Sequence, residues 1–322
     1  MKLGIYGYGN LGKGVELAIK KNKDIELAGI FSKRKNIQSI TGAKIYHIDE
    51  LMNFKNDIDV LVICAGSATE LPILTKELVK DFNVVDSFDT HANIKEHFEN
   101  VNKNAIEHKR IGLISGGWDP GMFSLARLYA TSVLPESATY TFWGKGISQG
   151  HSDAIRHIKG VKDARQYTIP IDDAIKKVES GVKPNLTVRE KHKRLCYVVV
   201  EEGADKKKIE NQIKNMPNYF ADYDTEVNFI TEEELVKEHS ESPSGGVVIT
   251  TGETGIENQH KHIIKYRLKL DSNPEFTSSV LCALSRAIYK MYKRGEVGCK
   301  TIFDIRPIDL SNKTNEEILH LL

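Results

Sequence analysis

The chain has 322 residues, 40% hydrophobic and 28% charged, so it is long enough for two domains that each bury a core. Its formal net charge is only +1 with both signs interspersed, which argues against binding to nucleic acid or to an anionic membrane. No apolar run approaches the roughly 18 residues that a membrane helix needs and no leader-like segment opens the chain, so we expect a cytoplasmic protein.

The first part of the chain predicts strands and helices that alternate at the spacing of βαβ units. Strands are expected at residues 3–6, 25–31, 60–65, 84–86 and 111–115, with helices at 11–21, 71–80 and 94–108. The strands are continuous apolar runs, which is typical of a parallel sheet covered by helices on both faces. We therefore expect an α/β protein whose N-terminal part is a Rossmann-type, doubly wound parallel sheet.

The character of the sequence changes after Gly117. We expect a helix at 122–133, a strand ending at Trp143 and a glycine-punctuated loop at 144–150. Longer strands follow at 195–200, 226–230, 247–251 and 262–271; their alternation indicates an antiparallel sheet, on which a helix at 274–294 would pack. The predicted domains are 1–118 for dinucleotide binding and 119–297 as an α+β domain, while the tail, 298–322, could return to the first.

The turn after the first strand carries a dinucleotide-binding pattern. It follows G-x-G-x-x-G, and its residues are Gly7, Tyr8, Gly9, Asn10, Leu11 and Gly12. Between a strand and a helix, such a turn lets the backbone approach a pyrophosphate at a helix N-terminus. An ordinary strand–turn–helix is the alternative.

The end of the second strand favours NADP over NAD. A site for NAD would place an acid there, on the ribose hydroxyls, but the chain has Ser32, Lys33 and Arg34. These side chains could bind a 2′-phosphate through charge-assisted hydrogen bonds. Asp24 and Glu26 precede or begin the strand and do not readily reach the ribose. A solvated basic turn is the alternative.

Small residues follow the third apolar strand, where a doubly wound sheet presents loops to its ligand. We expect them to lie against the nicotinamide half of the cofactor, although Ser67 could equally cap the next helix. The residues are Gly66, Ser67, Ala68 and Thr69. The four cysteines are far apart and no histidine motif is present, so no metal is expected.

Two carboxylates, Asp89 and Asp119, follow the ends of successive strands at the same edge of the predicted sheet. Each alone could be a turn or cap residue. Together they could hold an ammonium group, or help to remove a proton from an amine or a water molecule.

Eight segments, in order from residue 1 to about residue 295, resemble the meso-diaminopimelate dehydrogenase family. They are GYGNLG (7–12), IFSKR (30–34), GGWDPGMFS (116–124), TFWG (141–144), SQGHSD (148–153), QYT (166–168), HKR (192–194) and LKLDSNP (268–274). The resemblance implies reversible, NADP-dependent oxidative deamination of meso-2,6-diaminopimelate at its D-centre. It also implies a homodimer, a role in lysine biosynthesis, and substrate binding and dimerisation by residues 119–297.

The resemblance also assigns roles to individual residues. Asp89 and Asp119 would hold the amino group of the reacting D end. The carboxylate of the same end would lie near Gln149 and Gly150, with Trp143 as an apolar wall. The distal L end would be bound by Thr168, Arg194 and Asn273. Taken singly, these residues read more simply as a β-former, a surface ion-pair residue and a helix cap.

One position departs from the family pattern. The chain has Ser244 where the family commonly has a histidine that contacts the distal end of the substrate. Serine is shorter and cannot carry a positive charge, so affinity could be lower, unless water or His239 takes the place of the missing ring. Ser244 remains a candidate contact.

Two other functions fit parts of the sequence. The first is another NADP enzyme of the same build, such as a dihydrodipicolinate reductase or a homoserine dehydrogenase. Asp89, Asp119 and Arg194 argue against it, because they suit a substrate with two zwitterionic ends. The second is a dinucleotide sensor without catalytic activity, which the intact acidic residues and second domain disfavour.

Overall fold

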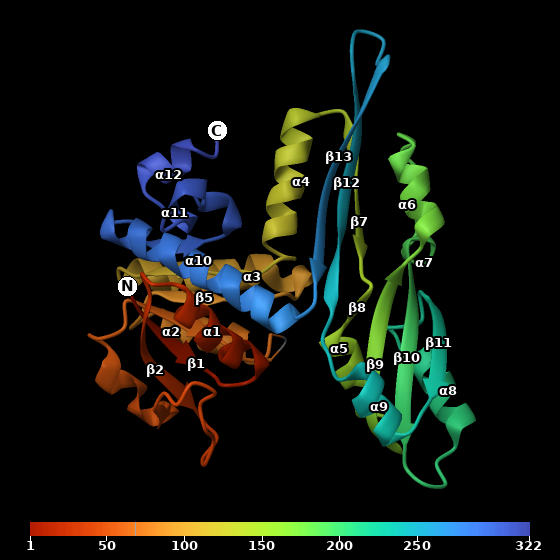
Figure 1. Ribbon diagram of the computed structural model, residues 1–322, viewed down its shortest axis with the longest axis horizontal. Helices are drawn as coiled ribbons and strands as arrows, with labels where there is room; N and C mark the ends of the chain where they lie inside the picture. The colour runs from red at the N-terminus through yellow and green to blue at the C-terminus, as the bar shows by residue number, and fades with distance from the viewer. Residues whose placement is uncertain (68) are drawn as a thin grey trace. The chain divides into compact units, whose positions relative to one another are not determined.

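The computed structural model describes residues 1–67 and 69–322. The chain forms two compact units, Met1–Leu125 with Pro274–Leu322, and Ala126–Asn273 (Figure 1). These boundaries differ from the expected ones at 118 and 297. Among the described residues, no helix combines the length and apolar composition that crossing a bilayer requires.

A seven-stranded sheet forms the centre of the first unit, and all of its strand pairs are parallel. Its order is β14-β6-β5-β4-β1-β2-β3. The strands are β1 (Lys2–Tyr6), β2 (Glu26–Ser32), β3 (Ile45–His47), β4 (Val60–Ile63), β5 (Val84–Asp86), β6 (Ile111–Leu113) and β14 (Gly298–Lys300). The strand order reverses between β1 and β4, the point at which a doubly wound sheet binds its ligand. The predicted fold class is confirmed.

Helices cover both faces of this sheet because alternate strand residues point in opposite directions. Leu3 and Ile5 of β1 join one core with α1 (Asn10–Lys21) and α10 (Asn273–Lys293). Tyr6 joins the other core, to which α2 (Leu71–Leu78) and α3 (Ile94–Glu107) contribute Leu71 and Val101. The prediction that α10 packs on the second domain's sheet is therefore wrong; its buried residues, including Leu281 and Leu284, belong to the first unit's core.

The C-terminal tail returns to the first unit, where β14 pairs with β6. Two short helices follow, α11 (Pro307–Leu310) and α12 (Asn315–Leu319). Buried Asp309 accepts hydrogen bonds from Arg294 at 2.9 and 3.1 Å and from Arg306 at 3.0 and 3.1 Å. Because Arg294 follows the end of α10, these bonds fasten the tail to that helix.

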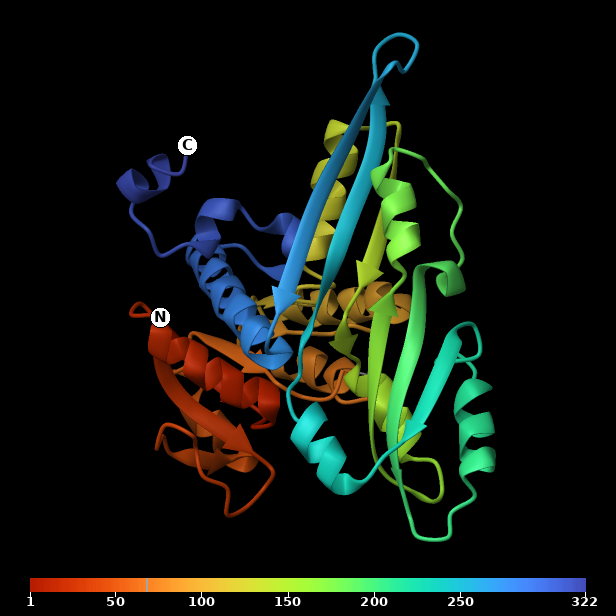
Figure 2. The ribbon, with the colours of Figure 1, turned by 45° about the vertical axis from the view of Figure 1, so that its right-hand side comes forward.

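The second unit contains two sheets, of order β11-β10-β9-β8 and β13-β12-β7. The strands are β7 (Ser137–Trp143), β8 (Gly146–Ile147), β9 (Val161–Pro170), β10 (His192–Val200), β11 (Asp224–Phe229), β12 (Ser244–Thr254) and β13 (His260–Leu270). The helices are α5 (Gln149–Arg156), α6 (Asp172–Glu179), α7 (Val188–Lys191), α8 (Lys206–Lys214) and α9 (Glu232–His239). Figure 2 shows the long β12–β13 hairpin of the second sheet.

The expected antiparallel sheet is thus two sheets, and one of them is mixed. β10 and β11 pair in parallel, because α8 lies between them in the chain and returns β11 in the direction of β10. The expected loop at 144–150 instead holds β8 and the first turn of α5, for which Ser148 is the N-cap. Helix α4 (Met122–Val133), as predicted, carries the chain from the first unit into the second.

Candidate active site

The glycine turn between β1 and α1 leaves an open cradle at a helix N-terminus. Gly7 has φ +93°, and a Cβ on it would lie 2.3 Å from the carbonyl oxygen of Cys64. A Cβ on Gly12 would lie 2.2 Å from the carbonyl oxygen of Gly7, so both positions are closed to side chains. Gly9, the N-cap of α1, has nothing within 4 Å of its Cβ position and no capping side chain. Uncapped N–H groups beside open space suit a phosphate.

Tyr8 and Leu11, within the same turn, are fixed by the first unit. The buried Tyr8 hydroxyl donates a hydrogen bond to the buried carboxylate of Glu16 and accepts one from the Ile40 N–H at 2.8 Å. The Leu11 carbonyl accepts a hydrogen bond from Ser278 of α10 at 2.9 Å. Asn10 is exposed at the first position of α1. The turn is therefore held in shape from behind while its front stays open.

The basic segment after β2 lies against this turn. The Arg34 guanidinium donates to the Tyr8 carbonyl, and the Arg34 N–H donates to the hydroxyl of buried Ser32 at 3.1 Å. Lys33 pairs with Glu70 at 3.2 Å, but both side chains are largely exposed, so the pair is weak and an anion could replace the carboxylate. Asp24 is bound instead by Arg286, with Nη2 2.9 Å from Oδ1, which agrees with the expectation that it does not serve the ribose.

The turn after β4 contacts the loop after β5. Ser67 accepts a hydrogen bond from the Asp89 N–H at 2.9 Å and donates one to the Asp89 carboxylate at 2.5 Å. Gly66 donates its N–H to Glu70 at 3.0 Å, and Thr69 is exposed in the same turn. Ala68 lies outside the described residues. Ser67 therefore joins the predicted cofactor turn to one of the two predicted carboxylates.

The second carboxylate, Asp119, lies in a tight turn between β6 and α4. The Met122 N–H donates to the Gly117 carbonyl at 3.1 Å, and the Phe123 N–H donates to the Trp118 carbonyl at 2.8 Å. Asp119 is half-buried, whereas Asp89 is exposed. Because β5 and β6 are parallel neighbours, Asp89 and Asp119 follow the same edge of the sheet, as predicted.

In the second unit, Arg194 of β10 is a buried cation that pairs with no carboxylate in the described chain. It lies opposite Thr168 of β9 and donates a hydrogen bond to the Thr168 hydroxyl. Its guanidinium carbon is 3.9 Å from the ring centre of Tyr223, and Nε has no hydrogen-bond partner. Burial lowers the pKa of Arg194 from its very high ordinary value, but a guanidinium remains charged at neutral pH. An uncompensated buried cation favours an anionic ligand.

Two histidines that feel the charge of this cation, buried His192 and half-buried His151, are neutral. Burial, reinforced by the charge of Arg194, lowers the pKa of His192 to about 3 and that of His151 to about 4. Neutral His192 accepts a hydrogen bond from the Trp143 N–H at 2.8 Å and stacks on the indole ring, with ring centres 5.3 Å apart. Trp143 is thus held by its backbone and by one face, while 36% of it remains exposed.

The remaining predicted substrate residues lie at the first positions of helices and strands. Gln149 and Gly150 open α5 and are exposed. Gly146 of β8 pairs with Thr168, and a Cβ on Gly146 would lie 3.0 Å from the Ser244 hydroxyl. The Asn273 N–H donates to the Ser242 carbonyl at 3.0 Å, which places Asn273 beside the start of β12. The second unit therefore gathers the predicted L-end residues around one short strand.

Comparison with known proteins identifies the family. Residues 117–272 match the family described as the diaminopimelic acid dehydrogenase C-terminal domain. The chain is also 56% identical over 321 residues to the meso-diaminopimelate D-dehydrogenase of Acetivibrio thermocellus, an alignment that covers 99% of this chain and 96% of the relative. The chain belongs to the meso-diaminopimelate D-dehydrogenase family. The resemblance inferred from the sequence is confirmed, and the protein is an enzyme.

Solved structures of this family share the whole fold. C. glutamicum DAP dehydrogenase in complex with DAP matches with a TM-score of 0.94 and 42% identity, over 99% of this chain and 98% of that one. An engineered D-amino acid dehydrogenase bound to NADP+ matches with a TM-score of 0.89 and 41% identity, over 99% and 98% of the two chains. Both matches extend over the two units.

His239 contacts two tyrosines of the sheet that carries Arg194. It accepts or donates a hydrogen bond with the Tyr167 hydroxyl at 2.8 Å and stacks on Tyr197 at 4.0 Å. Tyr167 alternates with Thr168 along β9, so its side chain is on the sheet face opposite Thr168 and Arg194. These contacts favour a supporting role for His239 beside the sheet of β9 and β10 over a role as substitute for the family histidine.

Sequence reasoning assigns no role to several residues that support the site. His192 belongs to the family-like segment 192–194 but receives no role of its own, although it alternates with Arg194 along β10 and therefore shares its face of the sheet. No sequence signal marks Tyr223, whose contact with Arg194 depends on how the segment before β11 folds.

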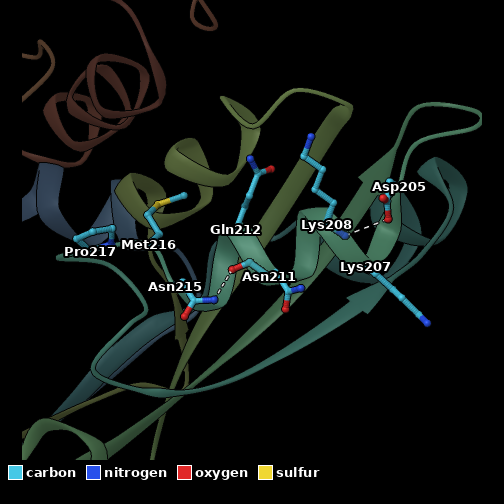
Figure 3. Close-up of a pocket in the computed structure, with 8 residues that line it drawn as sticks. All are labelled: Asp205, Lys207, Lys208, Asn211, Gln212, Asn215, Met216 and Pro217. Carbon is cyan, nitrogen blue, oxygen red and sulfur yellow. Dashed lines mark hydrogen bonds between the residues drawn. The ribbon is translucent and has the colours of Figure 1, made fainter.

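Neither a metal cluster within the described residues nor the hollow beside α8 contributes to this site. No group of three or more His, Cys, Asp or Glu in residues 1–67 and 69–322 is placed to hold a metal. A hollow of about 730 Å³ lies along α8 (Figure 3). Two of its polar side chains bond to the backbone of this helix: Asp205 accepts from the Lys208 N–H at 3.0 Å, and Asn215 donates to the Asn211 carbonyl at 2.8 Å.

Proposed function

We propose that this protein catalyses the reversible, NADP-dependent oxidative deamination of meso-2,6-diaminopimelate at its D-centre, as a step of lysine biosynthesis. The substrate, water and NADP+ would yield L-2-amino-6-oxopimelate, ammonia released as ammonium, NADPH and a proton. Family membership supports the reaction class, and the observation that carries the substrate assignment is the buried Arg194, which has no carboxylate partner among the described residues and contacts Thr168 and Tyr223 instead. A substrate whose far end bears a carboxylate would balance this charge.

The residues of the first unit fit NADP. The open position at Gly9 and the uncapped start of α1 would receive the pyrophosphate, while Ser32, Lys33 and Arg34 would bind the 2′-phosphate. The turn at 66–69 would lie along the nicotinamide half. When bound, NADP+ supplies the oxidant that accepts a hydride from the substrate's α-carbon. A homologous engineered dehydrogenase solved with NADP+ supports this assignment.

Asp89 and Asp119 would bind the ammonium group of the D-centre. A carboxylate near this group first orients it and then accepts a proton, because the nitrogen must lose its positive charge as the α-carbon is oxidised. After oxidation the same carboxylates could position the water that adds to the substrate's imine. Gln149 and the Gly150 N–H would hold the adjacent carboxylate, with Trp143 as an apolar wall.

Arg194, Thr168, Asn273 and Ser244 would bind the L end. A guanidinium can hold a carboxylate with two hydrogen bonds, and the neighbouring neutral histidines add no competing charge. This binding would fix which end of the substrate lies at the reacting position. It would therefore direct oxidation to the D-centre.

The protein would act as a homodimer. In the second unit, α4 exposes Leu128 by 46%, Tyr129 by 68% and Val133 by 53%, an apolar stripe that one chain alone leaves in water. A second copy would cover such a stripe. Sedimentation of the purified protein distinguishes the dimer from a monomer.

The deciding experiment follows NADPH absorbance with purified protein, NADP+ and either meso-diaminopimelate or its L,L isomer. Turnover of the meso form alone, with one ammonia per NADPH, is the expected result. NADP+ binding without turnover of any amino acid would support a dinucleotide sensor instead. Activity with an aspartate-family aldehyde or a cyclic imine, but not with meso-diaminopimelate, would support another enzyme of this build.

A further inference from the structure

The carboxylate of Asp86, at the end of β5, is completely buried and lies behind both predicted catalytic loops. These loops are residues 87–90 after β5, which contain Asp89, and residues 114–121 after β6, which contain Asp119. Asp86 itself precedes the first loop, and its exposed fraction is 0%. A buried carboxylate is costly unless it is well hydrogen-bonded, so its presence here requires an explanation.

One oxygen of this carboxylate binds the backbone of both loops. Oδ1 accepts the Phe88 N–H at 3.0 Å and the Ser115 N–H at 2.9 Å. The Asp86 carbonyl also accepts the Gly116 N–H at 2.8 Å. Phe88 immediately precedes Asp89, and Gly116 leads into the turn that presents Asp119. Through its carboxylate and its carbonyl, Asp86 therefore joins the two backbone segments beyond the paired residues of β5 and β6.

The other oxygen is held by two buried side chains. Oδ2 accepts a hydrogen bond from the Thr75 hydroxyl at 2.7 Å and lies 2.7 Å from Nε2 of His97. Thr75 comes from α2 and His97 from α3, so the carboxylate is anchored to the helical layer before it reaches the loops. The His97 ring also lies 4.4 Å from the Phe88 ring, which supports the first loop directly.

The backbone of the second loop would not adopt its shape without support. Ser115 has φ +57°, in the left-handed region that non-glycine residues rarely occupy. Its N–H is the group that Asp86 binds. A Cβ on the next residue, Gly116, would lie 2.8 Å from Leu284 and 3.0 Å from the Asp86 carbonyl oxygen, so the loop passes close to α10 as well. Backbone strain of this kind, maintained by its surroundings, is typical of functional segments.

From these contacts we infer that Asp86 is a positioning residue that sets the spacing of Asp89 and Asp119. The inference rests on the proposed function, because it gives those two carboxylates a common substrate. Asp86 touches neither substrate nor cofactor; it acts through the two loops. Reaction rates are sensitive to such placement, since an error of about 1 Å can cost about 100-fold.

The test compares Asp86→Ala, Asp86→Asn and a matched control, Asn83→Ala. Asn83 immediately precedes the same strand and also joins β6, because its Oδ1 accepts the Ile111 N–H at 3.2 Å, but it lies at the opposite edge of the sheet. We expect Asp86→Ala to lower kcat for meso-diaminopimelate about 100-fold and to leave the Kd for NADP+ within about threefold. Asn keeps an acceptor for both N–H groups, so Asp86→Asn should restore kcat to within about fivefold of the unsubstituted protein.

Thermal unfolding and kcat together separate positioning from stability. Asn83→Ala should lower Tm as much as Asp86→Ala and leave kcat unchanged. If Asp86→Ala does not fold, Asp86→Ser gives the same comparison, because its hydroxyl is too short to reach both N–H groups. Wild-type kcat in Asp86→Ala, or an equal loss of kcat in Asn83→Ala, would overturn the inference. Absence of turnover in the unsubstituted protein would instead overturn the proposed function, and the inference with it.

Discussion

Among single residues, Arg194 most directly links the fold to the choice of substrate. A hydrogen bond to a charged group contributes about 1.5–3 kcal/mol, so we expect Arg194→Met to raise KM for meso-diaminopimelate about 10- to 150-fold. KM for NADP+ should not change. Arg165→Met is the control, since Arg165 lies on the neighbouring strand but already pairs with Asp163 at 2.7 Å. Equal effects of the two substitutions would contradict the assignment.

At Ser244, a substitution is expected to increase the affinity for the substrate. A histidine there would restore the side chain that the family commonly has, and we expect Ser244→His to lower KM for meso-diaminopimelate about tenfold. Ser240→His, on the exposed end of α9, controls for an added imidazole. An unchanged or larger KM would show that this position does not contact the substrate.

His192 predicts how stability responds to acid. Its pKa is about 3 when folded and about 6.5 in an unfolded chain, so below pH 6.5 the unfolded chain binds a proton that the folded protein does not. The free energy of unfolding should therefore decrease as the pH is lowered from 6.5 toward 3. This group contributes at most about 1.4 kcal/mol per pH unit to that decrease. Urea unfolding at several pH values should show a shallower dependence for His192→Gln. Identical slopes would mean that His192 is protonated in the folded protein.

At the scale of elements, the two glycines Gly7 and Gly9 of the β1–turn–α1 unit are expected to serve different purposes, one in folding and the other in cofactor binding. Gly7→Ala would place Cβ 2.3 Å from the Cys64 carbonyl oxygen and should lower Tm sharply. Gly9→Ala meets no protein atom within 4 Å, so Tm should stay within a few degrees while NADP+ affinity falls at least about tenfold, because the methyl group would occupy the phosphate position. Calorimetry of both variants with NADP+ checks this. A Gly9→Ala protein that binds NADP+ normally would place the phosphates elsewhere.

The same scale shows what the sequence could predict. Continuous apolar runs predicted β1, β4 and β5 well, because both faces of a parallel sheet are buried and leave a strong signal. β8 and β14 are two and three residues long, and their existence depends on partners far away in the chain, so no local pattern marks them. The helical pattern predicts α10 as observed, but periodicity indicates which face of a helix is buried and not which sheet covers that face.

The residues of the candidate site also differ in how far the sequence predicts them. Motifs predicted the residues that would touch ligands, whereas the residues behind them were missed. Asp86 reads as the last residue of an apolar strand, and His97 as one polar residue on a helix; only the fold brings them together at 2.7 Å. Ser244 was predicted as a departure from a family pattern, but its position beside Gly146 required the structure.

At the scale of the whole molecule, we expect the parts of the C-terminal tail that pair with the first unit to contribute to its stability, and the exposed end of the tail to contribute little. A chain that ends at Gly295 lacks β14 and Asp309, which exposes the edge of β6 and leaves Arg294 without its buried partner. We expect this truncation to lower Tm by many degrees or to prevent soluble expression. A chain that ends at Lys313 loses only α12, which buries no residue, and should melt within a few degrees of the full chain. Similar melting of both truncations would refute a structural role for the tail.

The addition of β14 to the edge of β6 also sets an order for biosynthesis. Residues 126–273 are contiguous and can fold as soon as they leave the ribosome, whereas the unit that begins first must wait for its final strand and for α10. Until then, β6 remains an open edge that could pair with another nascent chain. The half of the enzyme that is translated first is therefore the half that matures last, and slow translation through residues 126–273 would lengthen its exposure to aggregation and to chaperones.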